Sequence, residues 1–410
     1  MRRIVLGTLL LILAGCAATK QVERNEQILH KAEQLSQSAI IVDTHIDVPY
    51  RLRNKMEDIT QYTKNGDKFS GEFDYPRAKQ GGLNVPFMSI YVPAEHETQK
   101  IAKSTADDLM RMMDSIITAH PEKFARAGSP ADVTAQFGKG LISFAYGMEN
   151  GSPIEGDLKN LKYFYDRGIR YITLTHGKDN HIGDSSYDTT HTWKGLSPFG
   201  KEVVVEMNRL GIMVDISHVS DDTFWQVLAL SKAPLIASHS SCRAYTPTFQ
   251  RNMSDEMIKA MAAKGGVIQI NFGSDFISDE YQKKDRDRRD SINAQLRPRN
   301  LTMRDSAGRV VAHEYEMHHP LAVVDVKDVA AHIDHVAKIA GIDHVGLGSD
   351  FDGVGDSLPT GLKDVSMYPN LIYELLALGY SDANIEKVCG KNLLRVWSTV
   401  EEVAHQLQRQ

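Results

Sequence analysis

The chain is poor in cysteine, in basic clusters and in long apolar segments. Only three of its 410 residues are cysteine, so the fold does not depend on a disulfide framework, although Cys242 and Cys389 could pair in an exported chain. The formal net charge is -6 and no basic block is visible, which argues against nucleic acid as a partner. Beyond the first 15 residues, no apolar run reaches the length needed to span a bilayer.

Motifs of two common enzyme classes are also missing. The chain has no G-x-S-x-G turn of the kind that carries a nucleophilic serine. It has no glycine-rich loop that would cradle a phosphate, and it shows neither internal repeats nor low-complexity segments. The chemistry must therefore reside in other side chains, of which the histidines and acids are the most informative.

The first 15 residues have the composition of an export signal. Two arginines precede an apolar stretch at residues 4–13, which is too short to cross a bilayer as a helix. Residues 13–16 read LAGC and resemble a bacterial lipoprotein box, which implies cleavage before Cys16 and attachment of lipid to its sulfur. Residue 17 is alanine rather than aspartate, which favours anchoring in the outer membrane, facing the periplasm.

Short apolar or β-branched runs bounded by turn residues recur along the rest of the chain and predict buried strands. They occupy residues 39–44, 85–92, 141–146, 171–175, 213–217, 235–238, 266–271 and 345–348. Between most of them, apolar residues recur at helical spacing, as at residues 202–210 and 326–340. Eight strands that alternate with helices predict a (β/α)8 TIM barrel rather than two domains.

We expect this barrel to fill residues 39–400 as a single domain. Residues 16–38 are polar and predict a tether behind the lipidated cysteine, either a short helix or a spacer, and residues 401–410 predict a tail. Residues 277–320 are highly charged and lack a clean apolar stripe. We interpret them as an insertion after the seventh strand that can be helical and that covers the mouth of the barrel. A solvated surface helix is the simpler account of the charges at residues 283–289.

Polar side chains stand at, or just beyond, the C-terminal ends of six predicted strands. They are His45, Glu149, His176, His218, His239 and Asp350. In a (β/α)8 barrel all these strand ends meet on one face, where active sites are built. The sequence therefore predicts that six separate segments deliver functional groups to one place.

Five residues near these strand ends have the chemistry of metal ligands. His45 and Asp47 are two residues apart in an extended chain, so both can face one ion. His218 and His239 end successive strands, and neutral imidazoles suit zinc. Glu149 could bridge two ions with one oxygen to each, the ions being about 3.5–4 Å apart.

Several motifs, in order, resemble those of the membrane dipeptidase family, also called renal dipeptidase. They are DTHID at residues 43–47, GMENG at 147–151, RYITLTH at 170–176, VDISH at 214–218, SHSS at 238–241 and GSDFDG at 348–353, followed by Pro369 and NLLRV at 392–396. The match covers residues 39–400, with residues 277–320 as the main departure. Independent motifs in a shared order make the resemblance specific.

The resemblance implies an amidohydrolase-like barrel that holds two zinc ions. One ion is expected at His45 and Asp47 and the other at His218 and His239, with Glu149 as the bridge. The same resemblance implies roles for three further residues.

His176 is expected to contact the substrate, and Asp350 to handle protons. The family also has an arginine, shortly after the SHSS motif, that holds the substrate carboxylate. Arg251 matches best, because an asparagine and a helix start follow it. Its spacing from His239 is one residue longer than expected, so Arg243 stays open as the alternative.

These roles describe a mechanism of dipeptide hydrolysis. Water that bridges two zinc ions loses a proton near neutral pH and becomes a hydroxide nucleophile. His176 would stabilise the developing oxyanion, and Asp350 would carry the proton to the leaving amine. Arg251 would clamp the C-terminal carboxylate, which limits the enzyme to dipeptides.

The leading prediction is a zinc-dependent dipeptidase that tolerates a D-residue at the C-terminal position. A binuclear amidohydrolase acting on N-acyl D-amino acids would share the same metals. A non-catalytic binding lipoprotein is the alternative from another class, and the presence of all five ligands and of Asp350 argues against it. The expected partners are a dipeptide and, through the lipid, a membrane; relatives are often dimers, so a homodimer is compatible.

Overall fold

A closed barrel of eight parallel strands forms the centre of the computed structural model, which describes residues 25–63, 71–303 and 305–410. The export signal and Cys16 lie outside the described residues. The barrel strands are β1 (Ile41–Ile46), β2 (Leu83–Tyr91), β4 (Ile142–Glu149), β5 (Ile169–Thr173), β6 (Met213–Asp215), β7 (Ile236–Ser240), β8 (Val267–Ile270) and β9 (Val345–Leu347). Each strand pairs with its neighbours, and pairing of β2 with β4 closes the ring. The predicted (β/α)8 fold is confirmed.

The sequence analysis missed one strand, β3 (Phe124–Arg126), which pairs in parallel with β4 outside the ring. It contacts residues 142–144 of β4, whereas β2 contacts residues 145–149. The two strands therefore share one edge of β4 along its length. A run of three residues is too short to show a strand period in the sequence.

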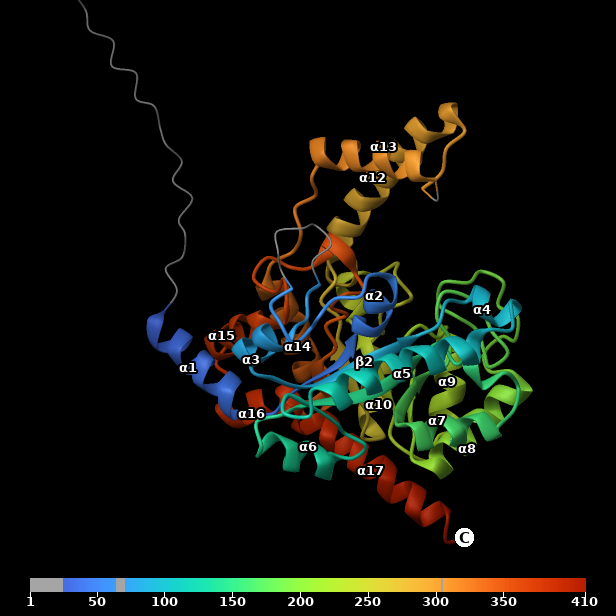
Figure 1. Cartoon of the computed structure of the whole chain (residues 1–410), viewed down its shortest axis with the longest axis vertical. Helices are drawn as coiled ribbons and strands as arrows, with labels where there is room; N and C mark the ends of the chain where they lie inside the picture. Colours follow the sequence, from blue (N-terminus) through green and yellow to red (C-terminus); the bar gives the residue numbers. More distant parts are fainter. Residues whose placement is uncertain (1–24, 64–70, 304) are drawn as a thin grey trace, which may run out of the picture.

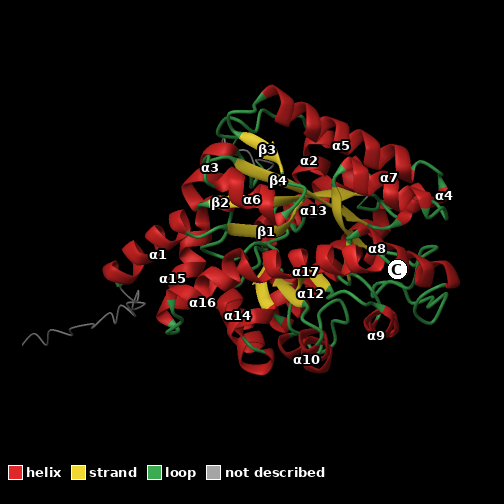
Figure 2. Ribbon diagram, turned by 90° about the horizontal axis from the view of Figure 1, so that it is seen from below, coloured by secondary structure: helices red, strands yellow, loops and turns green. Residues whose placement is uncertain are grey.

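Helices surround the strands on all sides of the barrel (Figure 2). They are α1 (Glu26–Ser38), α2 (Val48–Asn54), α3 (Tyr75–Gly81), α4 (Glu95–Thr98), α5 (Ala102–Ala119), α6 (Pro130–Phe137), α7 (Lys159–Arg167), α8 (Pro198–Leu210), α9 (Asp221–Leu230), α10 (Asp255–Ala263), α11 (Ser274–Ile277), α12 (Asp279–Leu296), α13 (Ser306–His318), α14 (Val326–Ala340), α15 (Tyr368–Ala377), α16 (Asp382–Glu386) and α17 (Asn392–Leu407). None of the helices in these described ranges is long and apolar enough to cross a membrane.

Local signals in the sequence fix where many of these helices begin and end. Ser197, Ser220 and Ser254 cap α8, α9 and α10 by accepting a hydrogen bond from a backbone N–H of the first turn. Asp325 caps α14 in a reciprocal capping box. Gly211 ends α8 in the left-handed conformation, with a φ of 84°. The loops that carry the site are therefore anchored at both ends.

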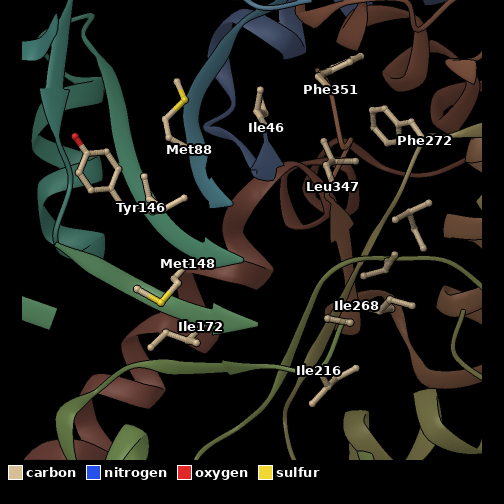
Figure 3. Packing of buried hydrophobic residues seen from close by; sticks show 14 of the residues in the cluster. Ile46, Met88, Tyr146, Met148, Ile172, Ile216, Ile268, Phe272, Leu347 and Phe351 are labelled. Carbon is tan, nitrogen blue, oxygen red and sulfur yellow. The ribbon is translucent and has the colours of Figure 1, made fainter. Parts of the chain in front are cut away.

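Two hydrophobic clusters lie on the two sides of the barrel wall. The inner cluster takes side chains from every barrel strand except β9 and is closed by Trp397 of α17. Within it, the ring of Phe87 lies 5.5 Å from the ring of Tyr171 and 5.4 Å from that of Trp397. The larger cluster packs the strands against the helices, and Figure 3 shows part of it, including Met148 and Ile172. The barrel interior is thus a packed core below the strand ends.

Both ends of the packed chain extend beyond the predicted barrel boundaries. Residues 26–38, predicted as part of the tether, form the helical alternative, and α1 packs against α15 with Ala32 and Leu35 buried. The expected tail at residues 401–410 is mostly the last two turns of α17, where Ala404 is buried. Both segments look polar in sequence because only one narrow stripe of each helix is apolar.

Residues 277–320 form a helical arm made of α12 and α13, which stands away from the barrel (Figure 1). The two helices pack through a small core of Ile292, Leu296 and Ala312. The expected cover over the mouth is wrong, because within the described chain no residue of α12 or α13 lines the cavity at the strand ends. The charges of α12 pair within the helix instead, as Lys284 does with Glu280.

The two cysteines within the described residues, Cys242 and Cys389, are both buried and free. Burial raises the pKa of the Cys389 thiol to about 12. Each behaves as a small apolar side chain in the core rather than as a reactive thiol.

Candidate metal centre

The C-terminal ends of the barrel strands surround a cavity of about 590 Å³. Five of the predicted site residues line it, namely Asp47, Glu149, His176, His218 and Asp350. His45 and His239 lie directly beneath, at 0% and 1% exposure. The structure therefore brings seven predicted residues from separate segments to one place.

Glu149, the last residue of β4, lies between two groups of histidines. Its Oε2 is 3.4 Å from Nε2 of His45. Its Oε1 is 3.2 Å from Nε2 of His218 and 3.4 Å from Nε2 of His239, and these two nitrogens are 2.9 Å apart. Each carboxylate oxygen faces a different set of imidazoles, which is the arrangement that a bridge between two cations requires.

Asp47 and Asp350 complete the group around His45. Nε2 of His45 lies 3.5 Å from Oδ2 of Asp47, and the ligand atoms of His45, Asp47 and Asp350 all lie within 4.8 Å of one another. Gly353 makes this approach possible, because a Cβ at this position would lie 2.2 Å from Oδ1 of Asp350 and 2.3 Å from Oδ2 of Asp47. Any larger residue at position 353 would separate the two carboxylates.

Three non-glycine residues that line the cavity have a left-handed backbone. The φ angle is 67° at His218, 64° at Asp350 and 65° at Asp352. Each follows the end of a strand, where the turn directs the chain into the site. Such conformations cost about 1–3 kcal/mol each and gather where function requires them. The rigid barrel below holds them in place.

The charges of the site shift the pKa values of its buried groups. Burial alone would raise the pKa of Glu149, but the imidazoles of His45 and His176 hold it well below its usual range. Burial, with help from the charge of Arg251, lowers the pKa of His218 and of His239 well below the usual value. Burial would lower the pKa of His45, but the neighbouring Tyr171, Glu149 and Asp47 raise it well above its usual value. An ionised glutamate beside the neutral imidazoles of His218 and His239 provides the protonation states that metal ligands need.

Asp350 has the opposite shift. Burial raises the pKa of its carboxyl group to about 7; His45 opposes this rise, and the negative charge of Asp47 adds to it. Nδ2 of Asn271 donates a hydrogen bond to Oδ2 of Asp350 over 2.7 Å and orients the carboxylate. A carboxyl group that titrates near neutral pH can both accept and return a proton.

The chemistry of these donors fits divalent cations. Nε2 of His45 is buried without a hydrogen-bond partner among the described residues, although the carboxylates of Asp47 and Glu149 are nearby. Three overlapping groups offer ligand atoms close together: His45, Glu149 and His239; Glu149, His176 and His218; and His45, Asp47 and Asp350. Mixed imidazole and carboxylate ligands are typical of zinc and related metals.

Of the two candidate arginines, Arg251 lies beside the site and Arg243 does not. Arg251 is buried, and its Nη2 donates to the carbonyl oxygen of His239 over 2.6 Å. Its Nη1 donates to Oγ of Ser240. Arg243 forms a bidentate pair with Asp221, with both contacts at 2.7 Å. Arg243 is therefore already engaged in an ion pair outside the cavity.

Aromatic side chains that the sequence analysis missed form much of the cavity wall. These are Tyr50, Tyr91, Tyr187 and Phe276. The ring of Tyr91 lies 4.8 Å from that of His176, and the ring of Phe276 lies 5.2 Å from the guanidinium carbon of Arg251. Tyr91 ends β2, and the other three lie in loops or helices without a distinctive motif. Position near a strand end is the one signal that could have indicated them.

Comparison with known families shows one match over most of the chain. The profile described as Membrane dipeptidase (Peptidase family M19) matches residues 29–410. An uncharacterized dipeptidase of Schizosaccharomyces pombe is 34% identical over 404 residues, which cover 94% of this chain and 86% of the relative.

Solved structures of dipeptidases are similar as well. The probable dipeptidase PvdM from Pseudomonas aeruginosa superimposes with a TM-score of 0.78 at 28% identity, covering 92% of this chain and 100% of that protein. A metallopeptidase from Rhodobacter sphaeroides, solved with a phosphinate mimic of the dipeptide L-Ala-D-Ala, gives a TM-score of 0.71 at 26% identity, with coverage of 88% and 99%.

Proposed function

The chain belongs to the membrane dipeptidase family, peptidase family M19, and from this premise we propose that it is a two-zinc dipeptidase that accepts a D-residue at the C-terminal position of its substrate. As a metallo-dipeptidase of this family, it is a hydrolase of peptide bonds. Membership of the family does not by itself establish three parts of this proposal: that the metal is zinc, that two ions bind, and that the substrate can carry a D-residue.

One observation carries the proposal: Glu149 presents one oxygen to His45 and the other to His218 and His239. A single cation would need only one of these sets. His45 and Asp47 would hold one ion, and the two remaining histidines the other, with Glu149 between them. When bound, two zinc ions supply a water nucleophile at neutral pH and polarise the scissile carbonyl.

Asp350 is proposed to move the proton. Its carboxyl group has a pKa of about 7, and nearby cations favour its ionised form. It would accept a proton from the attacking water at its carboxylate and return it to the leaving amine. His176, whose Nε2 lies 3.5 Å from Oε1 of Glu149 and whose side chain is 25% exposed, would donate a hydrogen bond to the carbonyl oxygen as it gains charge.

Arg251 is proposed to hold the C-terminal carboxylate of the substrate. Its Nε is buried and has no hydrogen-bond partner in the described part of the chain. Phe276 lines the cavity and packs on the guanidinium group, so the carboxylate has to approach past this ring. A longer peptide has no carboxylate at this depth, which would restrict the enzyme to dipeptides.

Acceptance of a D-residue is supported by the Rhodobacter sphaeroides relative, which was solved with a mimic of L-Ala-D-Ala. The test is hydrolysis of L-Ala-D-Ala and of L-Ala-L-Ala by purified protein lacking residues 1–16, with chelator and with added zinc. Bound zinc is measured in the same samples.

Zinc-dependent cleavage with two ions per chain is the expected result, and the ratio of the two rates gives the stereochemical preference. Two bound zinc ions without cleavage of either dipeptide would reject the dipeptidase and turn attention to N-acyl D-amino acids. Absence of both metal and cleavage would reject a catalytic function.

We further propose that lipid on Cys16 anchors the enzyme to the outer membrane, facing the periplasm. The LAGC sequence at residues 13–16 supports this location. Growth of the producing cells with labelled palmitate should label the wild-type protein and not Cys16→Ser. Equal labelling of both proteins would reject the anchor.

A further inference from the structure

In two of the proposed ligands, His45 and His239, the ring nitrogen Nδ1 forms a hydrogen bond with a hydroxyl group deep in the barrel. We propose that Tyr171 and the pair Asp215–Ser238 are positioning residues that fix the proton of these imidazoles on Nδ1. Nε2 of each ring then presents a lone pair to the cation. The inference rests on the proposed metal centre, and it concerns how the protein prepares that centre.

The direction of the hydrogen bonds at Tyr171 allows one arrangement. The hydroxyl oxygen of Tyr171 is 2.9 Å from the carbonyl oxygen of Thr44 and 2.9 Å from Nδ1 of His45. A carbonyl oxygen can only accept, so the single hydroxyl proton goes to Thr44. The hydroxyl oxygen must then accept from His45, which requires a proton on Nδ1. The buried Nε2 of His45, which has no hydrogen-bond partner among the described residues, is left as the free lone pair.

Tyr171 reaches His45 through the barrel interior. It belongs to the inner cluster together with Phe87 and Trp397, and it extends from β5 to a residue of β1, three strands away around the ring. Gly147 on β4 leaves room for the ring, because a Cβ there would lie 1.9 Å from Cζ of Tyr171. The packed core below the site therefore fixes the side chain of Tyr171, and its hydroxyl group in turn orients His45.

A second chain of hydrogen bonds gives the same result at His239. Oγ of Ser238 is 2.6 Å from Oδ2 of Asp215 and 2.7 Å from Nδ1 of His239. A carboxylate can only accept, so Ser238 donates to Asp215 and accepts from His239. Nδ1 of His239 therefore carries the proton, and its Nε2 faces Glu149.

Asp215 is held firmly in this role. Its Oδ1 accepts from the backbone N–H groups of Ser217 and Ser238, over 3.0 and 2.8 Å. Its Oδ2 also accepts from the hydroxyl of Thr173. Asp215, the last residue of β6, is completely buried, and it belongs to none of the three groups of candidate ligands among the described residues. A buried carboxylate with this set of donors is well suited to orient a neighbouring hydroxyl group.

His218 provides the contrast within the same centre. Its Nδ1 is buried and has no hydrogen-bond partner among the residues that the structure describes. No acceptor in that part of the chain selects the protonated nitrogen of this ring. The positioning residues therefore orient His45 and His239, and among the described residues His218 has no counterpart to them.

The test compares zinc affinity in variants that remove one hydroxyl group. Tyr171→Phe and Ser238→Ala should each lower zinc affinity about 10–100-fold, measured by competition with a chromophoric chelator. Tyr146→Phe is the matched control for the first, because Tyr146 is buried on β4 and its hydroxyl bonds Asp114 over 2.9 Å. Ser241→Ala is the control for the second, because its hydroxyl donates to the carbonyl oxygen of Asn271. Both controls should keep wild-type affinity.

Nitrogen-15 spectra of ring-labelled histidine give a readout that a merely structural role would not change. In the zinc-loaded wild type, His45 and His239 should both show the Nδ1–H form, and each variant should lose it only at its own histidine. The inference would be overturned by equal zinc affinity in a variant and its control, or by an Nε2–H form at His45 in the wild type. Either result would leave the proposed metal centre standing. A wild-type protein that binds no zinc would overturn the proposed centre as well.

Discussion

The strand-end site and the α12–α13 arm contain similar residue types but use them in opposite ways. In the site, carboxylates such as Asp215 and Glu149 are buried, and their partners come from other strands. In the arm, Lys284 and Arg289 are exposed, and each pairs with an acid four residues away in the same helix. A helix that satisfies its own charges needs no barrel, whereas a buried carboxylate is stable only with partners that the fold supplies.

This difference indicates where substitutions matter. Geometry in the site depends on contacts between distant segments, so that small changes alter chemistry. The arm has its own small core of Ile292, Leu296 and Ala312, so that changes there should remain local. The following three predictions test this contrast, from the largest expected effect to the smallest.

Asp350→Asn should abolish most of the catalytic activity without disturbing the fold. If Asp350 carries the proton as proposed, its replacement should lower kcat on L-Ala-D-Ala about 10²–10⁴-fold, while the zinc content stays at the wild-type value. The matched control is Asp287→Asn on α12, where the aspartate is exposed, and it should keep wild-type kcat. A fall of less than tenfold for Asp350→Asn would remove this residue from the mechanism.

Leu296→Ala should loosen the arm and leave the site intact. Leu296 is 2% exposed in the small core of the arm, and loss of such a side chain costs about 2–5 kcal/mol. Hydrogen exchange should accelerate in α12 and α13, and kcat/KM on a small dipeptide should stay within twofold of wild type. Val310→Ala, where the side chain is 67% exposed, is the control for exchange. A parallel loss of kcat/KM would mean that the arm belongs to the site.

His332 forms hydrogen bonds on both sides of the connection between the site and the arm, and we expect its protonation to lower the stability of the folded protein at acid pH. Its Nδ1 accepts from the backbone N–H of Cys242, three residues after His239, and its Nε2 contacts the carbonyl oxygen of Ile277 at the base of the arm. Burial lowers its pKa from 6.5 to about 4, against the raising effect of the Ile277 carbonyl.

Below pH 6.5 the unfolded chain therefore takes up a proton that the folded protein excludes down to about pH 4. The stability of the folded protein should fall through this window, and no such loss should occur above it. Thermal melting of the wild type and of His332→Gln across pH 4–7 checks this, and the difference in Tm between them should narrow as the pH falls. A constant difference would show that His332 does not titrate in this range.

Much of the fold and of the candidate site could be predicted from sequence. Eight apolar runs predicted the barrel, and the residues that follow them, such as His45 and Glu149, were predicted to converge because parallel strand ends must meet. Arg251 was harder, because two arginines of similar spacing precede the same helix. The structure separates them by their partners, since Arg243 bonds Asp221 and Arg251 bonds the carbonyl of His239.

The sequence missed the residues whose importance depends on long-range contacts. Tyr171 is a tyrosine in an apolar strand, and nothing in its neighbourhood distinguishes it from a core residue. Its contact with His45 spans 126 positions in the chain. The position of the arm was predicted wrongly for a related reason, because a highly charged helix has no apolar stripe that would indicate which surface it packs against.

By itself, the sequence determined the barrel, the identity of the candidate ligands and their placement at strand ends, because these follow from local periodicity and from the rule that parallel strands end on one face. Only the tertiary structure decided which nitrogen of His45 and of His239 is free and which arginine is beside the site. It also decided that, within the described chain, no residue of α12 or α13 lines the cavity. These features depend on the closure of the barrel, which brings Tyr171 to β1 and Ser238 to Asp215 at distances that no local pattern records.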